Sequence, residues 1–359
     1  MATIKLQGIA HSYNDKSAGI IKPADYAVNS LNQCWQDGGA YALLGPSGCG
    51  KTTLLNIISG LIKPTEGRIL FDDVDVTDLI PEQRNIAQVF QFPVVYDTMT
   101  VAENLAFPLR NRGMAAAEIE SRVKTVLSML GLDSRADSRA RSLNADDKQK
   151  ISLGRGLVRT DVKAILFDEP LTVIDPHLKW QLRTELKKIH QQFKHTMIYV
   201  THDQTEALTF ADKVIVMHEG SIVQIGTPQQ LFEQPGHTFV GKFIGSPGMN
   251  VLPCQIEGSE VLIGGIRINL QRTINNTGEK FEIGVRPEHI QLSAETGMSV
   301  EVVAIEDVGR HVILRARLEG IEINIIVSEG VAIPESPKVI FDIDKINLYA
   351  NDYRVADNN

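Results

Sequence analysis

The sequence predicts an α/β domain with a helical insertion, followed by a smaller all-β domain. Between residues 39 and 217, short runs of consecutive apolar residues alternate with longer helical patterns. Runs that are apolar at every position are typical of parallel strands covered by helices on both faces. From about residue 236 the apolar residues recur at every second position, as in half-buried antiparallel strands. A chain of 359 residues is long enough for both domains, because single cores seldom grow past roughly 250 to 300 residues.

The expected elements follow one another in a simple order. Strands of the first domain, residues 1–235, are predicted at AYALLG, VKAILF, HTMIYV and KVIVM. Strand signals stop between about 92 and 160, where AAAEIESRVKTVLSMLGL and KQKISLGRGLVR have helical periodicity. In the second domain, residues 236–359, VLI-GG-IRI predicts a tight hairpin, and VEVVAIEDVG, HVILRARLEG and IEINIIV predict further strands.

Composition narrows the classes of function. The chain has 36 basic and 44 acidic residues, and this net charge of -8 argues against sequence-independent binding to nucleic acid. Three cysteines without C-x-x-C spacing suggest neither a disulfide framework nor a zinc site. The start, MATIKLQGIAHSY, lacks the pattern of a signal peptide, and no apolar run approaches the roughly 20 residues needed to span a bilayer. We therefore expect a cytosolic protein whose contact with a membrane depends on partner subunits.

A phosphate-binding loop lies between the predicted strand YALLG and a predicted helix. It matches G-x-x-x-x-G-K-[ST] in full. The expected nucleotide-binding residues are Gly45, Pro46, Ser47, Gly48, Cys49, Gly50, Lys51, Thr52 and Thr53. Backbone N–H groups of such a loop surround phosphates, Lys51 reaches the β and γ oxygens, and the Thr52 hydroxyl ligates Mg²⁺. Cys49 is open to two interpretations, a thiol whose pKa is lowered beside Lys51 or a small residue in a variable position.

Acidic and histidine side chains follow two other predicted strands. Asp168 and Glu169 end the run AILF, and His202 comes directly after HTMIYV and a threonine. Ligand groups lie at such carboxyl ends of strands in open α/β sheets. Asp168 is expected to hold Mg²⁺ through water, and Glu169 to activate the attacking water as general base. His202 is expected to contact the γ-phosphate and orient that water.

The order of Lys51, Gln91, Asp168-Glu169, Asp175 and His202 resembles ABC ATPases. The segments GPSGCGKTTLLNIISGL, TVAENLAFPL, LFDEPL, IYVTHDQTEAL, FIGSPGMN and GVRPEHI resemble the ATPase subunits of bacterial carbohydrate importers of the maltose and glycerol-phosphate type. The resemblance covers nearly the whole chain. It implies ATP and Mg²⁺ as cofactors, and an oligonucleotide-binding-like (OB-like, TOBE-type) regulatory domain at the carboxyl end. It also implies a peripheral position on the cytoplasmic face of the cell membrane.

The same resemblance assigns further roles. It implies that Tyr13 stacks on adenine, although Tyr26, which follows the insertion DKSAGIIKPAD, is an alternative. It implies that Gln91 contacts Mg²⁺ and reports to two transmembrane permease subunits, which in turn receive cargo from a solute-binding protein. The apolar segment FQFPVVYDTM around Gln91 would receive a helix of the permease, with core packing as the other explanation of its side chains. Asp175 would lie in the loop that faces a partner cassette.

One motif departs from the family. The signature LSGGQ, whose backbone amides bind the γ-phosphate held by the opposite subunit, is replaced by Leu143-Asn144-Ala145-Asp146-Asp147. At about 4 Å and an effective dielectric constant near 20, one carboxylate opposes a phosphate charge by roughly 4 kcal/mol before salt screening. The same residues are well suited to a helix start, with Asn144 as cap and two aspartates near the positive end of the dipole. We expect a good helix start and a poor phosphate clamp.

This departure predicts an asymmetric pair. The chain would form a heterodimer with a second, related cassette that carries an intact signature and completes the site of Lys51, Glu169 and His202. The signature variant and DEPLTVIDPHLKW resemble a glycerol uptake system, with a glycerol-phosphate or disaccharide importer as the runner-up. A soluble ABC-type regulatory ATPase without membrane partner and a protein that binds ATP without hydrolysing it are the alternative classes.

Overall fold

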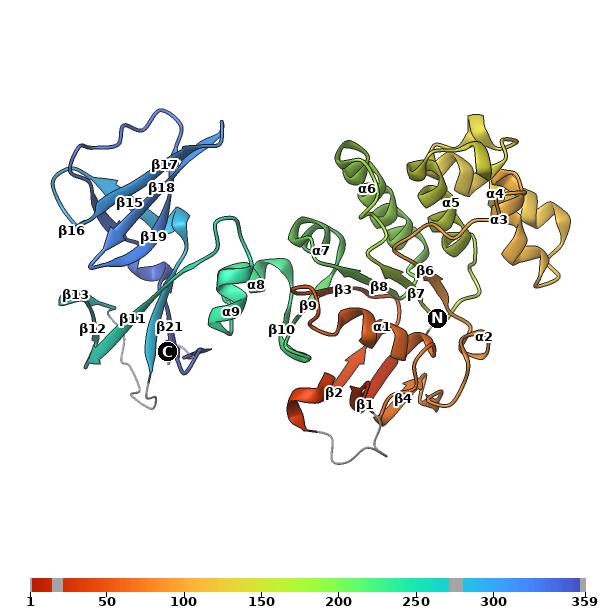
Figure 1. Cartoon of the computed structure of the whole chain (residues 1–359), viewed down its shortest axis with the longest axis horizontal. Coiled ribbons are helices and arrows are strands. Elements are labelled where there is room, and N and C mark those ends of the chain that lie inside the picture. The colour runs from red at the N-terminus through yellow and green to blue at the C-terminus, as the bar shows by residue number, and fades with distance from the viewer. Residues whose placement is uncertain (1, 15–21, 271–279, 356–359) are drawn as a thin grey trace. The chain divides into compact units, whose positions relative to one another are not determined.

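The computed structural model describes residues 2–14, 22–270 and 280–355, which form two compact units (Figure 1). The first unit ends at Pro228 and the second begins at Gln229. The sequence had placed this boundary at 235/236. All of α8 (Pro228–Glu233) after its first residue therefore belongs to the second unit. Arg286 of this unit holds α8 by donating hydrogen bonds of 3.0 and 2.7 Å to the carbonyl oxygen of Phe232.

The central sheet of the first unit has the order β10-β9-β3-β8-β7-β6. Pairing is parallel throughout except between β9 and β10. The strands are β3 (Ala40–Leu44), β6 (Ala87–Val89), β7 (Ile165–Asp168), β8 (Met197–Thr201), β9 (Lys213–His218) and β10 (Ser221–Gly226). The four predicted strands are β3, β7, β8 and β9, and β3, β8 and β7 are direct neighbours. The loops that carry the predicted site therefore leave the same edge of the sheet.

Helices cover this sheet and form the predicted insertion. They are α1 (Lys51–Ser59), α2 (Pro81–Arg84), α3 (Val101–Arg110), α4 (Ala116–Leu130), α5 (Ala145–Leu157), α6 (Pro176–Phe193) and α7 (Gln204–Phe210). In the insertion, α3 begins with a capping box formed by Thr100 and Glu103. Close packing of α5 depends on glycine, because a Cβ at Gly154 would lie 2.5 Å from Leu105 of α3. Helices α3, α4 and α5 thus form one packed body beside the sheet (Figure 1).

A second, antiparallel sheet of the first unit was not predicted. Its order is β2-β1-β4-β5. The strands are β1 (Ile4–Ser12), β2 (Tyr26–Trp35), β4 (Glu66–Phe71) and β5 (Val74–Asp75). Register shifts interrupt the pairing of β1 with both β2 and β4. Such irregularities break the period-two pattern by which a strand is found in a sequence.

The second unit is built from antiparallel strands around its own core. One sheet has the order β13-β12-β11-β14-β21-β22, and two smaller sheets have the orders β15-β20-β16 and β17-β18-β19. The predicted hairpin is found, with Ile263 paired to Ile266 across the two glycines. The elements are α9 (Thr238–Phe243), β11 (Asn250–Glu257), β12 (Glu260–Ile263), β13 (Ile266–Asn269), β14 (Phe281–Val285), β15 (Ile290–Ser293), β16 (Met298–Ser299), β17 (Glu301–Asp307), β18 (His311–Leu318), β19 (Ile321–Ser328), β20 (Lys338–Phe341), β21 (Asn347–Ala350) and β22 (Tyr353–Arg354).

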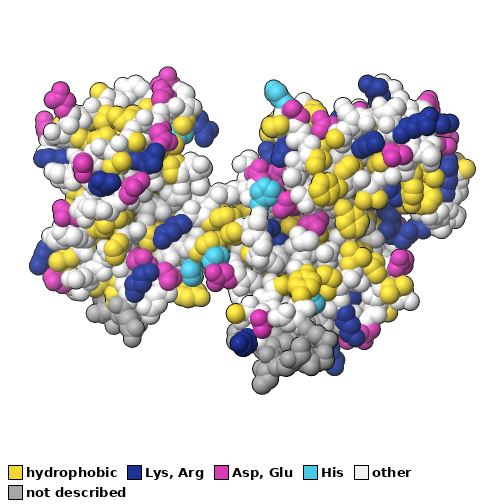
Figure 2. All heavy atoms as spheres, in the orientation of Figure 1, with side chains coloured by type: hydrophobic (Ala, Val, Ile, Leu, Met, Phe, Trp, Pro, Cys, Tyr) yellow, Lys and Arg dark blue, Asp and Glu magenta, His cyan; other side chains and the backbone are white. Residues whose placement is uncertain are grey.

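The surface of both units mixes charges of opposite sign. Figure 2 shows basic and acidic side chains interspersed over the face that it draws. Within the described residues, no helix has the length and apolar character required to cross a membrane.

Candidate active site

The phosphate-binding loop connects β3 to α1, as the motif predicts. Two of its glycines are required by the geometry. Gly50 has a φ of 97°, and a Cβ there would lie 2.3 Å from the carbonyl oxygen of Ala27. A Cβ at Gly45 would lie 2.3 Å from the carbonyl oxygen of Met217. Among the described residues, no side chain caps α1 at Gly50, so the positive end of this helix faces the loop.

Lys51 lies at the centre of this loop and is almost fully buried. Its Nζ donates hydrogen bonds of 2.8 Å to the carbonyl oxygens of Gly45 and Pro46, and lies 3.8 Å from the Sγ of Cys49. Burial raises the pKa of the Cys49 thiol, and the opposing effect of Lys51 is smaller. The structure therefore favours Cys49 as a small space-filling residue over a thiolate nucleophile.

Thr52 and Asp168 meet although they are far apart in the sequence. Thr52 Oγ1 donates a 3.1 Å hydrogen bond to Asp168 Oδ1, which projects from the carboxyl end of β7. Burial raises the pKa of Asp168, and the neighbouring Glu169 adds to the rise. A hydroxyl beside one carboxylate fits the ligand set of Mg²⁺, which takes one or two carboxylates together with phosphate oxygens. No cluster of three or more His, Cys, Asp or Glu with metal-binding geometry occurs within the described part of the chain.

Glu169 and His202 form the second pair. Their Oε2 and Nδ1 atoms lie 3.0 Å apart, and Thr172 donates a 3.3 Å hydrogen bond to the same carboxylate oxygen. Glu169 has a φ of 45°, a left-handed conformation that is uncommon outside glycine, asparagine and aspartate. The backbone N–H of Glu169 donates to Val200 of the neighbouring β8 at 2.9 Å. Adjacent parallel strands thus bring together the predicted general base and the predicted histidine.

Gln91 follows β6, the strand next to β7. Within the part of the chain that the structure describes, its side chain forms no hydrogen bond with the other predicted site residues. The loop that follows exposes Phe92, Val94 and Tyr96. Tyr96 is the least exposed of these three side chains, and the centre of its ring lies 4.6 Å from that of Phe107 on α3.

The two candidate adenine-stacking residues lie in different surroundings. Tyr13 follows β1 and is 66% exposed, and its hydroxyl lies 3.0 Å from Thr53 Oγ1 on α1. Tyr26 instead donates a 2.8 Å hydrogen bond to Glu66. The position beside α1 favours Tyr13. Residues 15–21 of the insertion that precedes Tyr26 lie outside the described residues.

The degenerate signature forms the amino end of α5. Asn144 caps the helix, and its Oδ1 accepts a 2.8 Å hydrogen bond from the N–H of Asp147. The carboxylate of Asp147 lies 3.8 Å from Lys150 Nζ. Leu143 precedes this cap, and Ala145 and Asp146 lie in the first turn. Elsewhere, Asp175 caps α6 by accepting a 2.9 Å hydrogen bond from the N–H of His177.

One buried residue close to the site was missed by the sequence analysis. Gln149 of α5 is fully buried, and its Nε2 donates hydrogen bonds to Pro170 O at 2.7 Å and to Phe90 O at 3.2 Å. Pro170 follows Glu169 and Phe90 precedes Gln91. The sequence indicates this residue only as a glutamine at a helix position that faces inward.

Known families and known proteins match this chain over most of its length. Family models match at residues 28–172 (ABC transporter), 245–290 (MalK OB fold domain) and 283–336 (TOBE domain). The sn-glycerol-3-phosphate import ATP-binding protein UgpC of Escherichia coli K12 is 42% identical over 315 residues, covering 86% of each chain. The protein of that name from Shigella boydii serotype 4 has the same identity and coverage.

Solved structures resemble the first part of the chain. The ATP-binding cassette MJ0796, in a dimeric post-hydrolysis state bound to ADP and Pi, is 28% identical with a TM-score of 0.55, covering 63% of this chain and 98% of its own. CbiO1 from Clostridium perfringens, part of the ABC transporter complex cbiONQ, is 27% identical with a TM-score of 0.57, covering 64% of this chain and 90% of its own. Together with the family models of the MalK OB fold and TOBE domains, these matches confirm the predicted fold class.

Proposed function

Because this chain belongs to the ABC transporter ATPases of the sn-glycerol-3-phosphate and maltose importer type, we propose that it energises uptake of a polyol, with glycerol as the first candidate. We also propose that it forms one half of an unequal ATPase pair. ATP hydrolysis coupled to transport, and permease subunits as partners, are properties of the family. The cargo, the heterodimer and the roles of individual residues are the proposed part. The proposed catalysis rests on two contacts beside the phosphate-binding loop, that of Thr52 with Asp168 and that of Glu169 with His202.

The proposed chemistry divides the work among these residues. Lys51 and the loop amides bind the phosphates, and Thr52 with Asp168 would hold Mg²⁺, aided by Gln91. Magnesium would supply charge neutralisation at the β and γ oxygens. Glu169 accepts a proton from the attacking water, and His202, already 3.0 Å from that carboxylate, orients it. At the opposite end of the nucleotide, Tyr13 provides a ring for the adenine.

The asymmetry rests on the amino end of α5. A helix start binds phosphate through N–H groups that no side chain has taken and through its positive dipole. Here the Asn144 side chain already accepts from the N–H of Asp147, and Asp146 and Asp147 place two carboxylates in the first turn. We propose that a second cassette with an intact signature closes the site on this chain. The opposite site, closed by this chain's signature, would hydrolyse ATP slowly or not at all.

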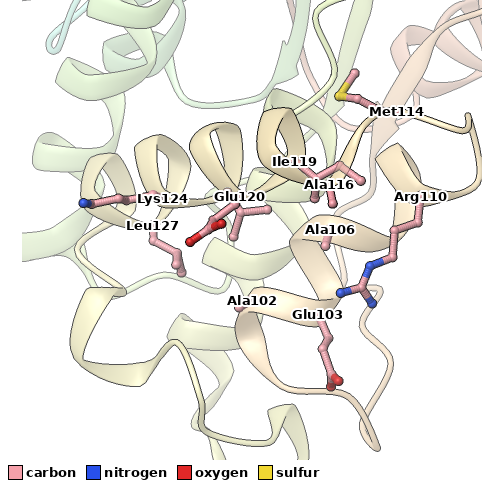
Figure 3. A pocket seen from close by; sticks show the side chains of 11 residues that line it. Ala102, Glu103, Ala106, Arg110, Met114, Ala116, Ile119, Glu120, Lys124 and Leu127 are labelled. Carbon is pink, nitrogen blue, oxygen red and sulfur yellow. The ribbon is translucent and has the colours of Figure 1, made fainter.

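The proposed contact with a permease lies on the helical insertion. The exposed side chains of Phe92 and Val94 present apolar surface directly after Gln91. Elsewhere on the insertion, α3 and α4 flank an open hollow of 540 Å³ (Figure 3). Its apolar lining comes from small and medium side chains such as Ala102, Ala106 and Ile119, with charged groups among them. Such a surface suits an amphipathic helix with an apolar face.

Glycerol phosphate is the second candidate cargo. The relatives that are 42% identical carry the name of sn-glycerol-3-phosphate importers, which favours the phosphate ester. The degenerate signature favours glycerol, because it resembles that of an uptake system with paired unequal cassettes. Uptake of the two labelled compounds by cells that produce either the unchanged chain or Glu169→Gln separates them. The cargo is the compound whose uptake the substitution abolishes.

The first test of the assembly is a count of subunits. The tagged chain is extracted from native membranes in mild detergent and weighed by native mass spectrometry. We expect one copy beside a second cassette and two membrane proteins. Two copies per complex would refute the heterodimer, and the absence of any membrane protein would instead support the soluble regulatory ATPase.

A further inference from the structure

Gln149 connects three parts of the proposed site through one side chain. It projects from α5, the helix that begins at the degenerate signature. Its amide nitrogen donates both to Pro170 O, next to the proposed general base, and to Phe90 O, next to Gln91. A shift of α5 by a few tenths of an ångström changes both distances together. Hydrogen bonds weaken over that range, so the two loops and the helix resist independent movement.

Other residues of α5 hold the same loop further along. Arg155 Nη1 donates a 2.5 Å hydrogen bond to Val94 O, and its guanidinium lies 4.6 Å from the centre of the Tyr96 ring. Ser152 accepts a 3.4 Å hydrogen bond from the N–H of Val94. The loop after β6 is therefore attached to α5 from Phe90 to Tyr96. Gln149 extends this attachment to the turn that contains Glu169, through its hydrogen bond to Pro170 O.

The chemistry of the buried amide supports a bridging role over simple packing. Both amide hydrogens are used by the two carbonyl oxygens, which leaves the Gln149 Oε1 buried without a partner within the described residues. Such an orphaned acceptor costs about 1–3 kcal/mol, which an apolar side chain of equal size would avoid. Packing alone would be served better by methionine or leucine. The bridge between the two loops is the feature that only the amide provides.

We propose that Gln149 is a positioning residue that couples the signature helix to the general base and to the permease-sensing loop, an inference that rests on the proposed function. When a nucleotide bound by the partner cassette displaces the amino end of α5, Gln149 transmits this displacement to Pro170 and Phe90. The position of Glu169 and the conformation of the loop at Gln91 then change together. A signature that clamps phosphate poorly still reports nucleotide occupancy through this side chain.

The test replaces the amide by an apolar side chain of similar size, Gln149→Met, in the complete transporter. The hydrogen bonds of the Gln149 side chain found among the described residues go to Phe90 and Pro170 and not to the phosphate-binding loop, so the KM for ATP should stay within about twofold. Misplacement of a catalytic group by a fraction of an ångström to 1 Å costs up to about 100-fold in rate, so kcat should fall about 10- to 100-fold. Cargo moved per ATP hydrolysed should also fall, because the Gln91 loop loses its link to the helix.

The matched control is Asn250→Leu in the second unit. Asn250 is also a buried amide, with hydrogen bonds of 2.9 and 2.8 Å to the backbone of Asn324. It should lower the melting temperature without changing kcat or cargo moved per ATP. Should Gln149→Met fail to assemble, Gln149→Asn, which keeps the amide but is too short to reach both carbonyls, is expected to give an intermediate loss of kcat.

Two results separate the possible failures. If the Gln149 variants behave like the control, with lower melting temperature and unchanged kcat and stoichiometry, the positioning role is wrong while the proposed function stands. If the unchanged transporter neither hydrolyses ATP nor binds a permease, the proposed function is wrong and the inference falls with it.

Discussion

Restoring the family signature should allow this chain to pair with itself. The change is N144S/A145G/D146G/D147Q, made in a Glu169→Gln background so that bound ATP persists. The substitutions remove the two carboxylates from the first turn of α5 and return a glycine to the position next to the cap. They leave the phosphate-binding loop unaltered. Any gain in ATP-dependent association therefore comes from the clamp.

The size of the gain follows from the charges. Lys150 lies 3.8 Å from the Asp147 carboxylate. For each aspartate we take a separation of about 8 Å from a bound phosphate, twice the distance of direct contact. At that distance and an effective dielectric constant near 20, each carboxylate opposes one net phosphate charge by about 2 kcal/mol. Screening over a Debye length of about 8 Å reduces this to about 0.8 kcal/mol. Two carboxylates at each of two sites then oppose closure by about 3 kcal/mol, or about 150-fold in the dissociation constant.

The assay is sedimentation velocity of the full chain with and without Mg-ATP over a range of concentrations. The restored chain should dimerise with ATP at concentrations at which the unrestored chain stays monomeric. Glu82→Gln/Asp137→Asn removes two exposed acidic groups outside α5 and controls for net charge. Equal ATP-driven dimerisation of the restored and unrestored chains would show that the carboxylates do not impair the clamp, and the case for an unequal pair would fail.

Three further outcomes follow from the site. Burial raises the pKa of Asp168, so the folded state binds that proton more tightly than the unfolded state and stability is lost as the pH rises through the raised pKa. Asp168→Asn, which still accepts from Thr52, should raise the melting temperature of the nucleotide-free chain at neutral pH but not in acid, measured by scanning fluorimetry, while ATPase activity falls. Glu169→Gln should reduce kcat by about 10²–10⁴-fold and leave ATP affinity nearly unchanged, as measured by steady-state turnover and nucleotide binding; a rate close to that of the unchanged enzyme would exclude Glu169 as general base and leave His202 to be tested. Burial raises the pKa of the Cys49 thiol, so iodoacetamide should alkylate it far more slowly at pH 7.5 than a free cysteine, and rapid alkylation detected by mass spectrometry would restore the reactive-thiol interpretation.

Much of the site could be predicted because its residues stand at the ends of apolar runs. Lys51 follows β3 through the phosphate-binding loop, Asp168 is the last residue of β7, and His202 comes directly after β8. These three strands are neighbours in a parallel sheet. Carboxyl ends of neighbouring parallel strands meet at one edge, so local patterns were enough to bring these side chains together. The helical insertion and the β hairpin were likewise visible as uninterrupted periodicity.

Features that depend on distant pairing were not visible. The sheet of β1, β2, β4 and β5 contains register shifts, and no single strand in it has a clean alternating pattern. The boundary near residue 228 depends on Arg286, which binds Phe232 from far along the chain. Gln149 belongs to the same class, because its two acceptors come from loops that the sequence separates widely. No sequence motif marks a buried glutamine, so its role can be recognised only once its hydrogen-bond partners are known.

The signature shows how one segment can lose one property and keep another. Asn144 and the two aspartates favour the start of α5, through the cap and the helix dipole, so the residues that we propose weaken the phosphate clamp do not weaken the helix. The face of α5 that carries Gln149, Ser152 and Arg155 still holds the loop after β6. In the proposed unequal pair, selection for transport can therefore relax the clamp in one subunit while the same helix continues to position the proposed general base and the proposed permease contact. An unequal pair then needs one good clamp, but it needs this helix in both subunits.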